Sequence, residues 1–318
     1  MPGSLLGIQE LPREEIRTIL DRAKYFQPFQ RDRQRSDALS GRMIVNLFFE
    51  ASTRTRVSFE IAARKLGADA ISISASGSSV SKGESLVDTL ATLAAMRPDA
   101  IVMRHAASGA PHFLARHLDT PIVNAGDGLH EHPTQALLDA RTILDHRETL
   151  EGLRVAIIGD LAHSRVARSN IHLLSKFGAS IVLCGPATLL PREMAQLAPG
   201  VEITHDIREA VAGADVVMML RVQLERQHEA PIPAGEYFGS YGLRLEHLPL
   251  AKDNVLVMHP GPINRGREID SEVADSSQSV ILNQVENGIA VRMAVLERVL
   301  GEEAHRPDAT SVRSVVRG

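Results

Sequence analysis

The chain has 318 residues, of which 44% are hydrophobic and 23% charged, and its formal net charge is −4. This length predicts about two domains. The single cysteine, Cys184, excludes an intrachain disulfide and a multi-cysteine metal cluster. So few cysteines are typical of a cytoplasmic protein. The negative charge and 3% aromatic content argue against nucleic-acid binding, and we expect neither a signal peptide nor a membrane segment.

Short apolar segments alternate with amphipathic segments through the first half of the chain. Strands are expected at 43–49, 68–74, 99–104 and 121–124, and helices at 12–26, 53–66, 84–96 and 133–147. The polar stretch 27–41 and the serine- and glycine-rich stretch 74–85 are expected to be irregular.

The same alternation continues in the second half. Strands are expected at 154–160, 179–185, 201–204, 214–220 and 254–259, and helices at 164–177, 191–198, 206–212 and 279–300. This order predicts an α/β protein with two doubly wound parallel-sheet domains. We place the first domain at 1–147, the second at 148–278 and a tail at 301–318.

Six predicted strands are followed by loops rich in Arg, His, Ser, Thr and Gln. These loops are 50–56, 104–105, 124–135, 159–165, 221–226 and 259–266. In open α/β sheets, ligands bind beyond the carboxyl ends of the strands. The loops contain no paired carboxylates and no nucleophile–base pair at a recognised spacing, so they favour the binding of anions.

The sequence Ser52-Thr53-Arg54-Thr55 stands where a helix is expected to begin. Free N–H groups and the helix dipole favour an anion there, and a guanidinium binds two phosphate oxygens at once. The residues therefore predict a phosphate site. The alternative is that Ser52 only caps the helix and that Arg54 and Arg56 are surface charges.

Two further segments of the first half carry candidate ligands. The loop containing Lys82 lacks the Gly-Lys-Ser/Thr ending of a nucleotide-binding P-loop, and it either closes over an anion or is a linker. Pro133 is expected at the first helical position, so His132 lies at the helix start, where a neutral imidazole can donate to a carbonyl or simply pack.

The second half lacks a dinucleotide-binding fingerprint, because Gly159-Asp160-Leu161-Ala162-His163 stands where G-x-G-x-x-G is expected. Arg165 and Arg221 can each pair with a carboxylate or serve as structural arginines. The histidines have no metal-ligand spacing such as H-E-x-x-H. We therefore expect neither a cofactor nor a catalytic metal. The histidines considered are His105, His112, His117 and His163.

The chain resembles the aspartate/ornithine carbamoyltransferase family. The family pattern F-x-x-S-T-R-T-R-x-S-F-E matches 49–60, H-P-T-Q-x-L-x-D matches 132–139, and the serine-rich segment around Lys82 is similar to the family's lid. The sequence R-V-Q-L-E-R at 221–226 resembles the aspartate-specific members. The ornithine-specific H-P-C-Q and S-M-G motifs are absent.

The resemblance implies how carbamoyl phosphate is bound. Its phosphate is expected at Ser52, Thr53, Arg54 and Thr55, and Arg104 is expected to bridge the phosphate and the carbonyl group. Thr55, Arg104 and His132 would polarise the carbonyl oxygen, and Gln135 would hold the carbamoyl NH₂. Ser78 and Lys82 would come from the neighbouring subunit of a homotrimer; Ser79 and Ser81 are alternatives to Ser78.

The resemblance also implies a site for L-aspartate. Arg165 is expected to face the α-carboxylate, Arg221 and Gln223 the side-chain carboxylate, and Lys82 both. The backbone at Pro260 and Gly261 would line this site, although family members often carry Leu in place of Gly261. The helix at 279–300 would return to the first domain.

The expected reaction is carbamoyl transfer to aspartate in pyrimidine biosynthesis. Two alternatives are a carbamoyltransferase for another amino acid, such as ornithine, and a non-catalytic scaffold subunit. The sequence of residues 259–266 resembles the family variant that is associated with dihydroorotase partners. The sequence leaves open whether such an enzyme or regulatory chains bind the trimer.

Overall fold

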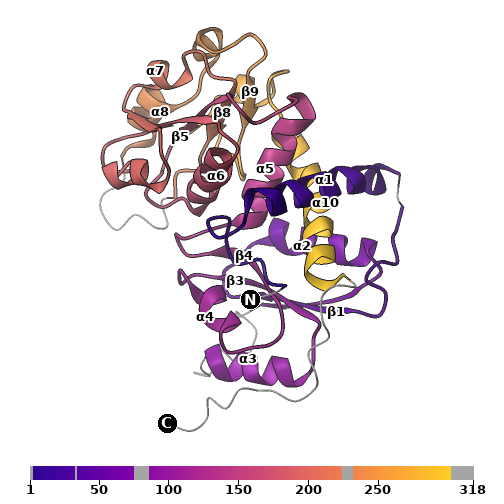
Figure 1. Ribbon diagram of the computed structural model, residues 1–318. Coiled ribbons are helices and arrows are strands. Elements are labelled where there is room, and N and C mark those ends of the chain that lie inside the picture. The colour runs from indigo at the N-terminus through magenta and orange to yellow at the C-terminus, as the bar shows by residue number, and fades with distance from the viewer. Residues whose placement is uncertain (1–2, 33, 75–85, 224–231, 302–318) are drawn as a thin grey trace. The chain divides into compact units, whose positions relative to one another are not determined.

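The computed structural model describes residues 3–32, 34–74, 86–223 and 232–301. It contains two compact units (Figure 1). Unit 1 comprises Met1–Leu137 and Asn287–Gly318, and unit 2 comprises Leu138–Glu286. Among the described residues, none of the helices has both the length and the apolar character that a membrane crossing requires.

Unit 1 contains a four-stranded parallel sheet with the strand order β2-β1-β3-β4. Its strands are β1 (Met43–Phe48), β2 (Asp69–Ser74), β3 (Ala100–His105) and β4 (Ile122–Asp127). Its helices are α1 (Arg13–Arg31), α2 (Thr53–Lys65), α3 (Leu86–Ala95), α4 (Ala110–Ala115), the start of α5 (Pro133–His146) and most of α10 (Ile281–Leu300).

Both faces of the unit 1 sheet are covered. Val45 and Leu47 of β1 belong to an apolar cluster with Leu93 of α3 and Leu114 of α4. The alternate residues of a strand point to the opposite face, where α2 packs on β1 and β2 with the buried side chain of Phe59. This two-sided burial explains why β1 and β3 read as nearly continuous apolar runs, whereas the edge strand β2 is largely exposed.

The C-terminal helix α10 lies against α1 in unit 1 (Figure 1). Arg22 of α1 donates from Nη2 to Glu297 at 2.6 Å, and Arg298 forms an ion pair with Glu15. Buried apolar side chains such as Val295 line the same helix. The expected return of the last helix to the first domain is therefore confirmed.

Unit 2 contains a five-stranded parallel sheet with the order β7-β6-β5-β8-β9. Its strands are β5 (Arg154–Ile158), β6 (Ser180–Cys184), β7 (Val201–Thr204), β8 (Val216–Met219) and β9 (Leu256–Met258). Its helices, besides the rest of α5 and α10, are α6 (Arg165–Lys176), η3 (Arg192–Leu197), α7 (Ile207–Val211), α8 (Ala234–Tyr241), η5 (Leu245–Leu250) and α9 (Ser271–Ala274).

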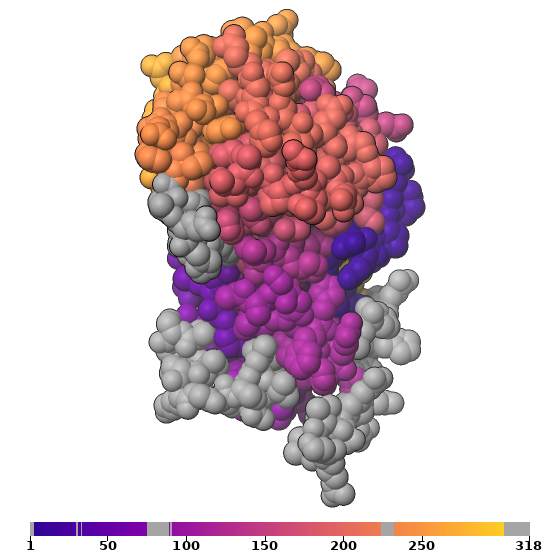
Figure 2. Space-filling view, turned by 90° about the vertical axis from the view of Figure 1, so that its left-hand side faces the viewer, coloured from indigo at the N-terminus to yellow at the C-terminus, as the bar shows by residue number. Residues whose placement is uncertain are grey.

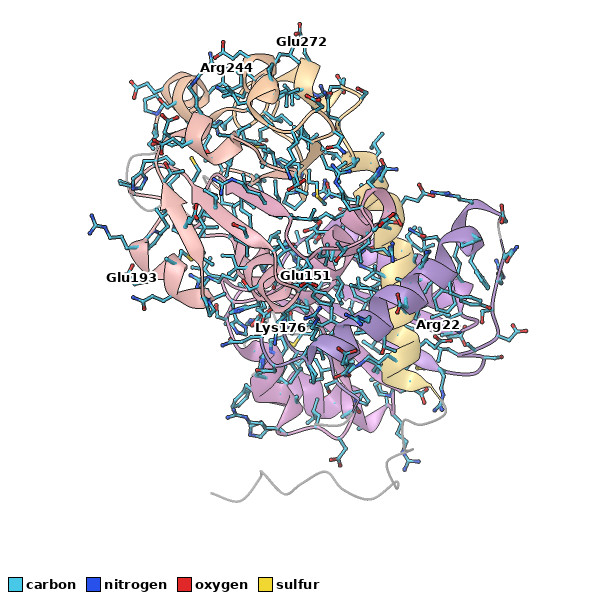
Figure 3. All side chains as sticks on the ribbon, turned by 45° about the horizontal axis from the view of Figure 1, so that its top comes forward. Arg22, Glu151, Lys176, Glu193, Arg244 and Glu272 are labelled. Carbon is cyan, nitrogen blue, oxygen red and sulfur yellow. The ribbon has the colours of Figure 1, made fainter. Side chains whose placement is uncertain are left out.

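The first strand of unit 2, β5, is central, because later strands add on both of its sides. Surface from the end of the unit (orange) consequently lies beside surface from its middle (salmon) in Figure 2. The apolar side chains are buried between sheet and helices, while charged side chains such as Glu193 and Glu272 point outward (Figure 3). The predicted fold class, two doubly wound parallel-sheet domains, is confirmed.

Some predicted elements differ from the structure. Helix α1 continues through Pro28 to Arg31, whereas we expected it to end near residue 26. A proline removes one N–H donor but leaves its own carbonyl, which here accepts from the backbone N–H of Asp32 at 2.9 Å. The short helices α4, α8, η5 and α9 were not predicted, because four to eight residues give little periodic signal.

Cys184 is predicted to be unreactive in the folded protein. It is fully buried in β6, and burial raises the pKa of its thiol from 9.0 to about 12. We expect no reaction with a thiol reagent such as DTNB at pH 8 until guanidinium chloride unfolds the chain. Because the unfolded thiol ionises first, stability should fall as pH rises above about 9. Rapid labelling of the native protein would contradict this prediction.

Candidate active site

The predicted phosphate-binding sequence lies between β1 and α2 in unit 1. Ser52 immediately precedes α2, and its hydroxyl donates to Oγ1 of Thr55 at 2.9 Å instead of capping a backbone N–H. Thr53 and Arg54 are exposed, whereas Thr55 is buried. The first turn of α2 therefore presents hydroxyl groups, a guanidinium and the positive end of the helix at one sheet edge.

Arg104 is held at the end of the neighbouring strand β3. Its Nη2 donates to Oε1 of Glu50 at 2.6 Å, and its Nη1 donates to the carbonyl of Ala125 at 3.3 Å. The side chain is only 11% exposed. This ion pair fixes the guanidinium close to the β1 end, since Phe48 is paired in register with Arg104.

The loop after β4 is ordered by the buried carboxylate of Asp127. Its oxygens accept hydrogen bonds from the Asn124 side chain, the Glu131 backbone N–H and the Gly109 backbone N–H, at 2.8, 3.1 and 2.6 Å. Burial raises the pKa of Asp127, but hydrogen bonds from His130, Asn124 and Gly109 outweigh it and hold the pKa below its ordinary value. The ionised carboxylate thus stabilises the loop that leads to the next candidate residues.

His132 and Gln135 lie at the start of α5, directly after this loop. The backbone N–H of Gln135 donates to the carbonyl of His132 at 3.0 Å, which closes the first helical turn. Both side chains are buried, with exposures of 5% and 8%. A buried imidazole at the positive end of a helix is disfavoured as imidazolium, so His132 is suited to donating to an uncharged carbonyl oxygen.

These residues gather at the switch point of the unit 1 sheet. The chain crosses from β1 to β2 on one side and later returns to β3 on the other, so the β1 and β3 ends diverge there. The residues of unit 1 that come from these ends and the adjacent β4 loop are called the unit 1 set. They are Ser52, Thr53, Arg54, Thr55, Arg104, His132 and Gln135.

Unit 2 has its own candidate residues at the equivalent switch point, between β5 and β8. Arg165 is the first residue of α6 and is 5% exposed. The preceding Ser164 caps the helix by accepting from the backbone N–H of Ala167 at 3.1 Å. Arg221 follows β8 by two residues and is partly exposed.

Gln223 is tied to the loop that follows β5. Its Nε2 donates to the carbonyl of His163 at 2.8 Å, and its backbone N–H donates to Asp160 at 3.3 Å. Asp160 also bonds Nδ1 of His163 at 2.8 Å. The carboxylate of Asp160 therefore connects the loops after β5 and β8 and positions Gln223.

The loop after β9 has a fixed backbone at Pro260 and Gly261. The Gly261 N–H donates to Nδ1 of His259 at 2.8 Å, and Nε2 of the same ring contacts Glu268 at 3.2 Å. Gly261 has φ +64°, in the left-handed region that favours glycine. Arg165, Arg221, Gln223, Pro260 and Gly261 are called the unit 2 set.

Some predicted residues cannot be placed, and some structural ones were not predicted. Lys82 and Ser78, with the alternatives Ser79 and Ser81, lie outside the described residues. Sequence reasoning gave no role to Glu50 or Asp160, which hold Arg104 and Gln223. The only sequence signal was a carboxylate in a strand-end loop rich in cationic and hydroxyl groups.

Two family models together match almost all of the described chain. The aspartate/ornithine carbamoyltransferase carbamoyl-P binding domain matches residues 4–145, and the Asp/Orn binding domain of the same family matches residues 151–299. The chain therefore belongs to the aspartate/ornithine carbamoyltransferase family.

Among curated relatives, the aspartate carbamoyltransferase catalytic subunit of Solibacter usitatus is 77% identical over 95% of this chain and 100% of its own length. That of Geobacter sulfurreducens is 56% identical, covering 94% and 96%.

Solved structures that resemble this chain belong to the same family. Aspartate transcarbamoylase from Trypanosoma cruzi in complex with N-(phosphonacetyl)-L-aspartic acid has a TM-score of 0.86 and 31% identity, covering 94% of this chain and 97% of that one. Ornithine carbamoyltransferase from Pyrococcus furiosus has a TM-score of 0.83, also with 31% identity and coverages of 94% and 97%. The fold is thus common to aspartate- and ornithine-specific enzymes.

Proposed function

We propose that this chain transfers the carbamoyl group of carbamoyl phosphate to the α-amine of L-aspartate, giving N-carbamoyl-L-aspartate and phosphate. The observation that carries the proposal is the 77% identity, over 95% of the chain, to an aspartate carbamoyltransferase catalytic subunit. The T. cruzi enzyme with carbamoyl phosphate and aspartate bound, at a TM-score of 0.84, supports both substrates. The reaction belongs to pyrimidine biosynthesis.

Carbamoyl phosphate binds to the unit 1 set in this proposal. Its phosphate is held by Ser52, Thr53, Arg54 and Thr55, where the exposed guanidinium and the start of α2 favour a dianion. The residues around the carbonyl are Thr55, Arg104, His132 and Gln135. The first three donate to its oxygen, and Gln135 holds the NH₂ group.

L-Aspartate binds to the unit 2 set. Arg165 pairs with the α-carboxylate, and Arg221 and Gln223 receive the side-chain carboxylate, while the backbone at 260–261 lines the site. A cationic ornithine side chain would meet the like charge of Arg221, which disfavours the ornithine alternative. The residues 1–147 with the helix at about 279–300 thus serve carbamoyl phosphate, and 148–278 serve aspartate.

The chemistry requires positioning and electrostatic stabilisation. The unprotonated amine attacks the carbonyl carbon, the bond from that carbon to the phosphate oxygen breaks, and the departing phosphate accepts the amine proton. Negative charge builds on the carbonyl oxygen during attack, and a preorganised donor such as Arg104, held by Glu50, stabilises it by about 3–4 kcal/mol. Holding both substrates in attack geometry contributes several kcal/mol more.

The proposed enzyme is a cytoplasmic homotrimer with shared active sites. Ser78 and Lys82 of one subunit complete the site of its neighbour, and Lys82 contacts both substrates. These two residues are assigned by the family resemblance, because they lie outside the described residues. The mass of the native assembly would show whether dihydroorotase or regulatory chains join the trimer.

An assay of the purified chain with carbamoyl phosphate and a panel of amino acids tests the function. We expect phosphate release with L-aspartate and little or none with L-ornithine. Faster carbamoylation of ornithine would support the ornithine alternative. A folded trimer that is inactive with every amino acid would support the scaffold alternative.

A further inference from the structure

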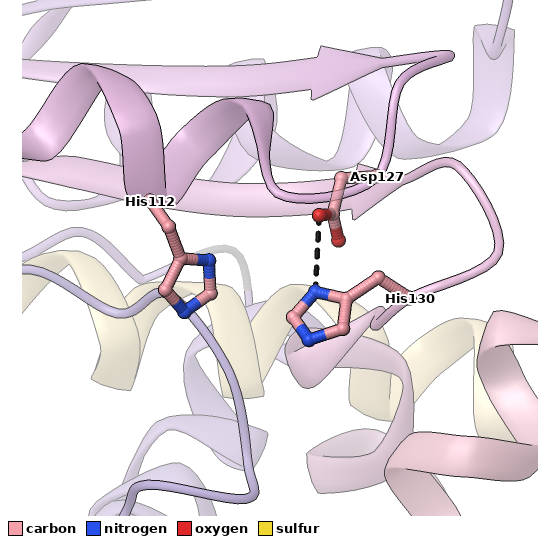
Figure 4. A group of neighbouring side chains, drawn as sticks. All are labelled: His112, Asp127 and His130. Atoms are coloured by element: carbon pink, nitrogen blue, oxygen red, sulfur yellow. Dashed lines mark hydrogen bonds and ion pairs between the residues drawn. The ribbon is translucent and has the colours of Figure 1, made fainter.

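Three side chains that are distant in the sequence meet on unit 1, outside the proposed active-site residues. They are His112 of α4, Asp127 at the end of β4 and His130 in the following loop (Figure 4). One ligand atom from each lies within 4.8 Å of the other two. Asp127 is fully buried, whereas the side chains of His112 and His130 are 21% and 33% exposed, so solvent reaches the group.

His112 has one ring nitrogen bonded and one available. Its Nε2 lies 2.8 Å from the Glu10 carboxylate, which acts only as an acceptor, so Nε2 carries the proton. Its Nδ1 is buried and finds no hydrogen-bond partner among the described residues. A histidine that donates one N–H to a carboxylate and keeps the other nitrogen as a lone pair is the usual arrangement of a metal ligand.

Asp127 and His130 are already spaced as neighbouring ligands. Nδ1 of His130 donates to Oδ2 of Asp127 at 3.1 Å, and a bound metal ion would displace this proton. Two ligand atoms bound at about 2.0–2.1 Å to a tetrahedral ion lie roughly 3.3 Å apart.

We propose that His112, Asp127 and His130 bind one divalent transition-metal ion of the Zn²⁺ type, through Nδ1 of His112, Oδ2 of Asp127 and Nδ1 of His130. Two imidazoles and one carboxylate favour Zn²⁺, Ni²⁺ or Cu²⁺ over Mg²⁺ and Ca²⁺, which prefer oxygen ligands. Binding requires the three ligand atoms to draw together from within 4.8 Å, and a water molecule completes four-coordination.

None of the three ligands is among the residues proposed to contact either substrate, although Asp127 also orders the loop before His132. The ion would link α4 to the loop after β4, and through Glu10 it would also secure the N-terminal segment of unit 1. Because the ion binds the folded arrangement only, it stabilises the folded chain. The histidine spacing gave no indication of the site, because the fold and not a local motif brings the ligands together.

Zinc binding to the intact chain, without substrates, tests the proposal. Free Zn²⁺ is set by competition with a chromophoric chelator, and bound metal is counted per chain. We expect one equivalent of Zn²⁺ and a higher melting temperature in its presence. His112→Ala and His130→Ala should each weaken binding by at least about tenfold, and Glu10→Gln by about tenfold through loss of the second-shell contact.

His117→Ala is the matched control, because His117 lies just beyond α4 and its Nδ1 contacts the carbonyl of Phe113. It should bind zinc as the unaltered chain does. Circular dichroism confirms that each variant is folded. The proposal is overturned if the unaltered chain binds no zinc, or if either folded variant, His112→Ala or His130→Ala, binds it with unchanged affinity. Activity plays no part in this test, so its result is independent of the proposed function.

Discussion

Arg54→Ala is expected to abolish measurable carbamoyl transfer while leaving the chain folded. The guanidinium stands in the first turn of α2, exposed, at the proposed phosphate position. Removing one preorganised donor to a developing charge typically lowers kcat by about 10²–10³-fold, and loss of a phosphate anchor adds to this. The free energy of unfolding should change by about 0.5 kcal/mol or less, because the side chain is exposed. Steady-state kinetics and a denaturant titration measure the two effects.

Arg64→Ala provides the control for this prediction. Arg64 is an exposed arginine in the last turn of the same helix, so the substitution removes the same charge far from the helix start. We expect activity close to that of the unaltered chain. If Arg54→Ala were equally active, Arg54 would have to be removed from the site.

Mixing two inactive variants, Lys82→Ala and Arg104→Ala, is expected to restore activity. In a trimer with shared sites, each site takes Arg104 from one subunit and Lys82 from its neighbour. Random assembly of a 1:1 mixture makes about one site in four intact, so the mixture should recover roughly a quarter of the original kcat. The subunits must be unfolded and refolded together, and the rate is measured per trimer.

The same two variants refolded separately and then combined are the control. Without exchange of subunits they should remain inactive, which shows that recovery requires mixed trimers. If co-refolded mixtures form trimers but remain inactive, Lys82 and Arg104 act within one subunit and the shared site is wrong.

Much of the fold was predictable because each element carries its own local signal. The apolar runs of β1, β3, β5 and β8 are bounded by polar loops, and the rule that ligands bind at carboxyl strand ends then located Arg104, Arg165 and Arg221. These residues follow the strands that flank the switch points of the two sheets, where open α/β sheets bind ligands.

The remaining features depend on contacts between residues far apart in the sequence. Glu50 holds Arg104 across 54 positions, and Glu131 accepts the backbone N–H of Ile8 across 123 positions. The hydrophobic periodicity that predicts helices and strands does not indicate such long-range pairs. For the same reason, the spacing of the histidines in the sequence could not indicate that His112 lies close to His130 in the fold.

The ion pairs of α10 with α1 have a consequence for biosynthesis. Arg22 and Glu15 of α1 are translated well before their partners Glu297 and Arg298, which lie 275 and 283 positions further along the chain. Unit 1 therefore cannot finish folding until α10 has been translated, whereas unit 2, Leu138–Glu286, is continuous and can fold earlier. Premature termination before Glu297 would leave Arg22 and Glu15 of α1 without these partners.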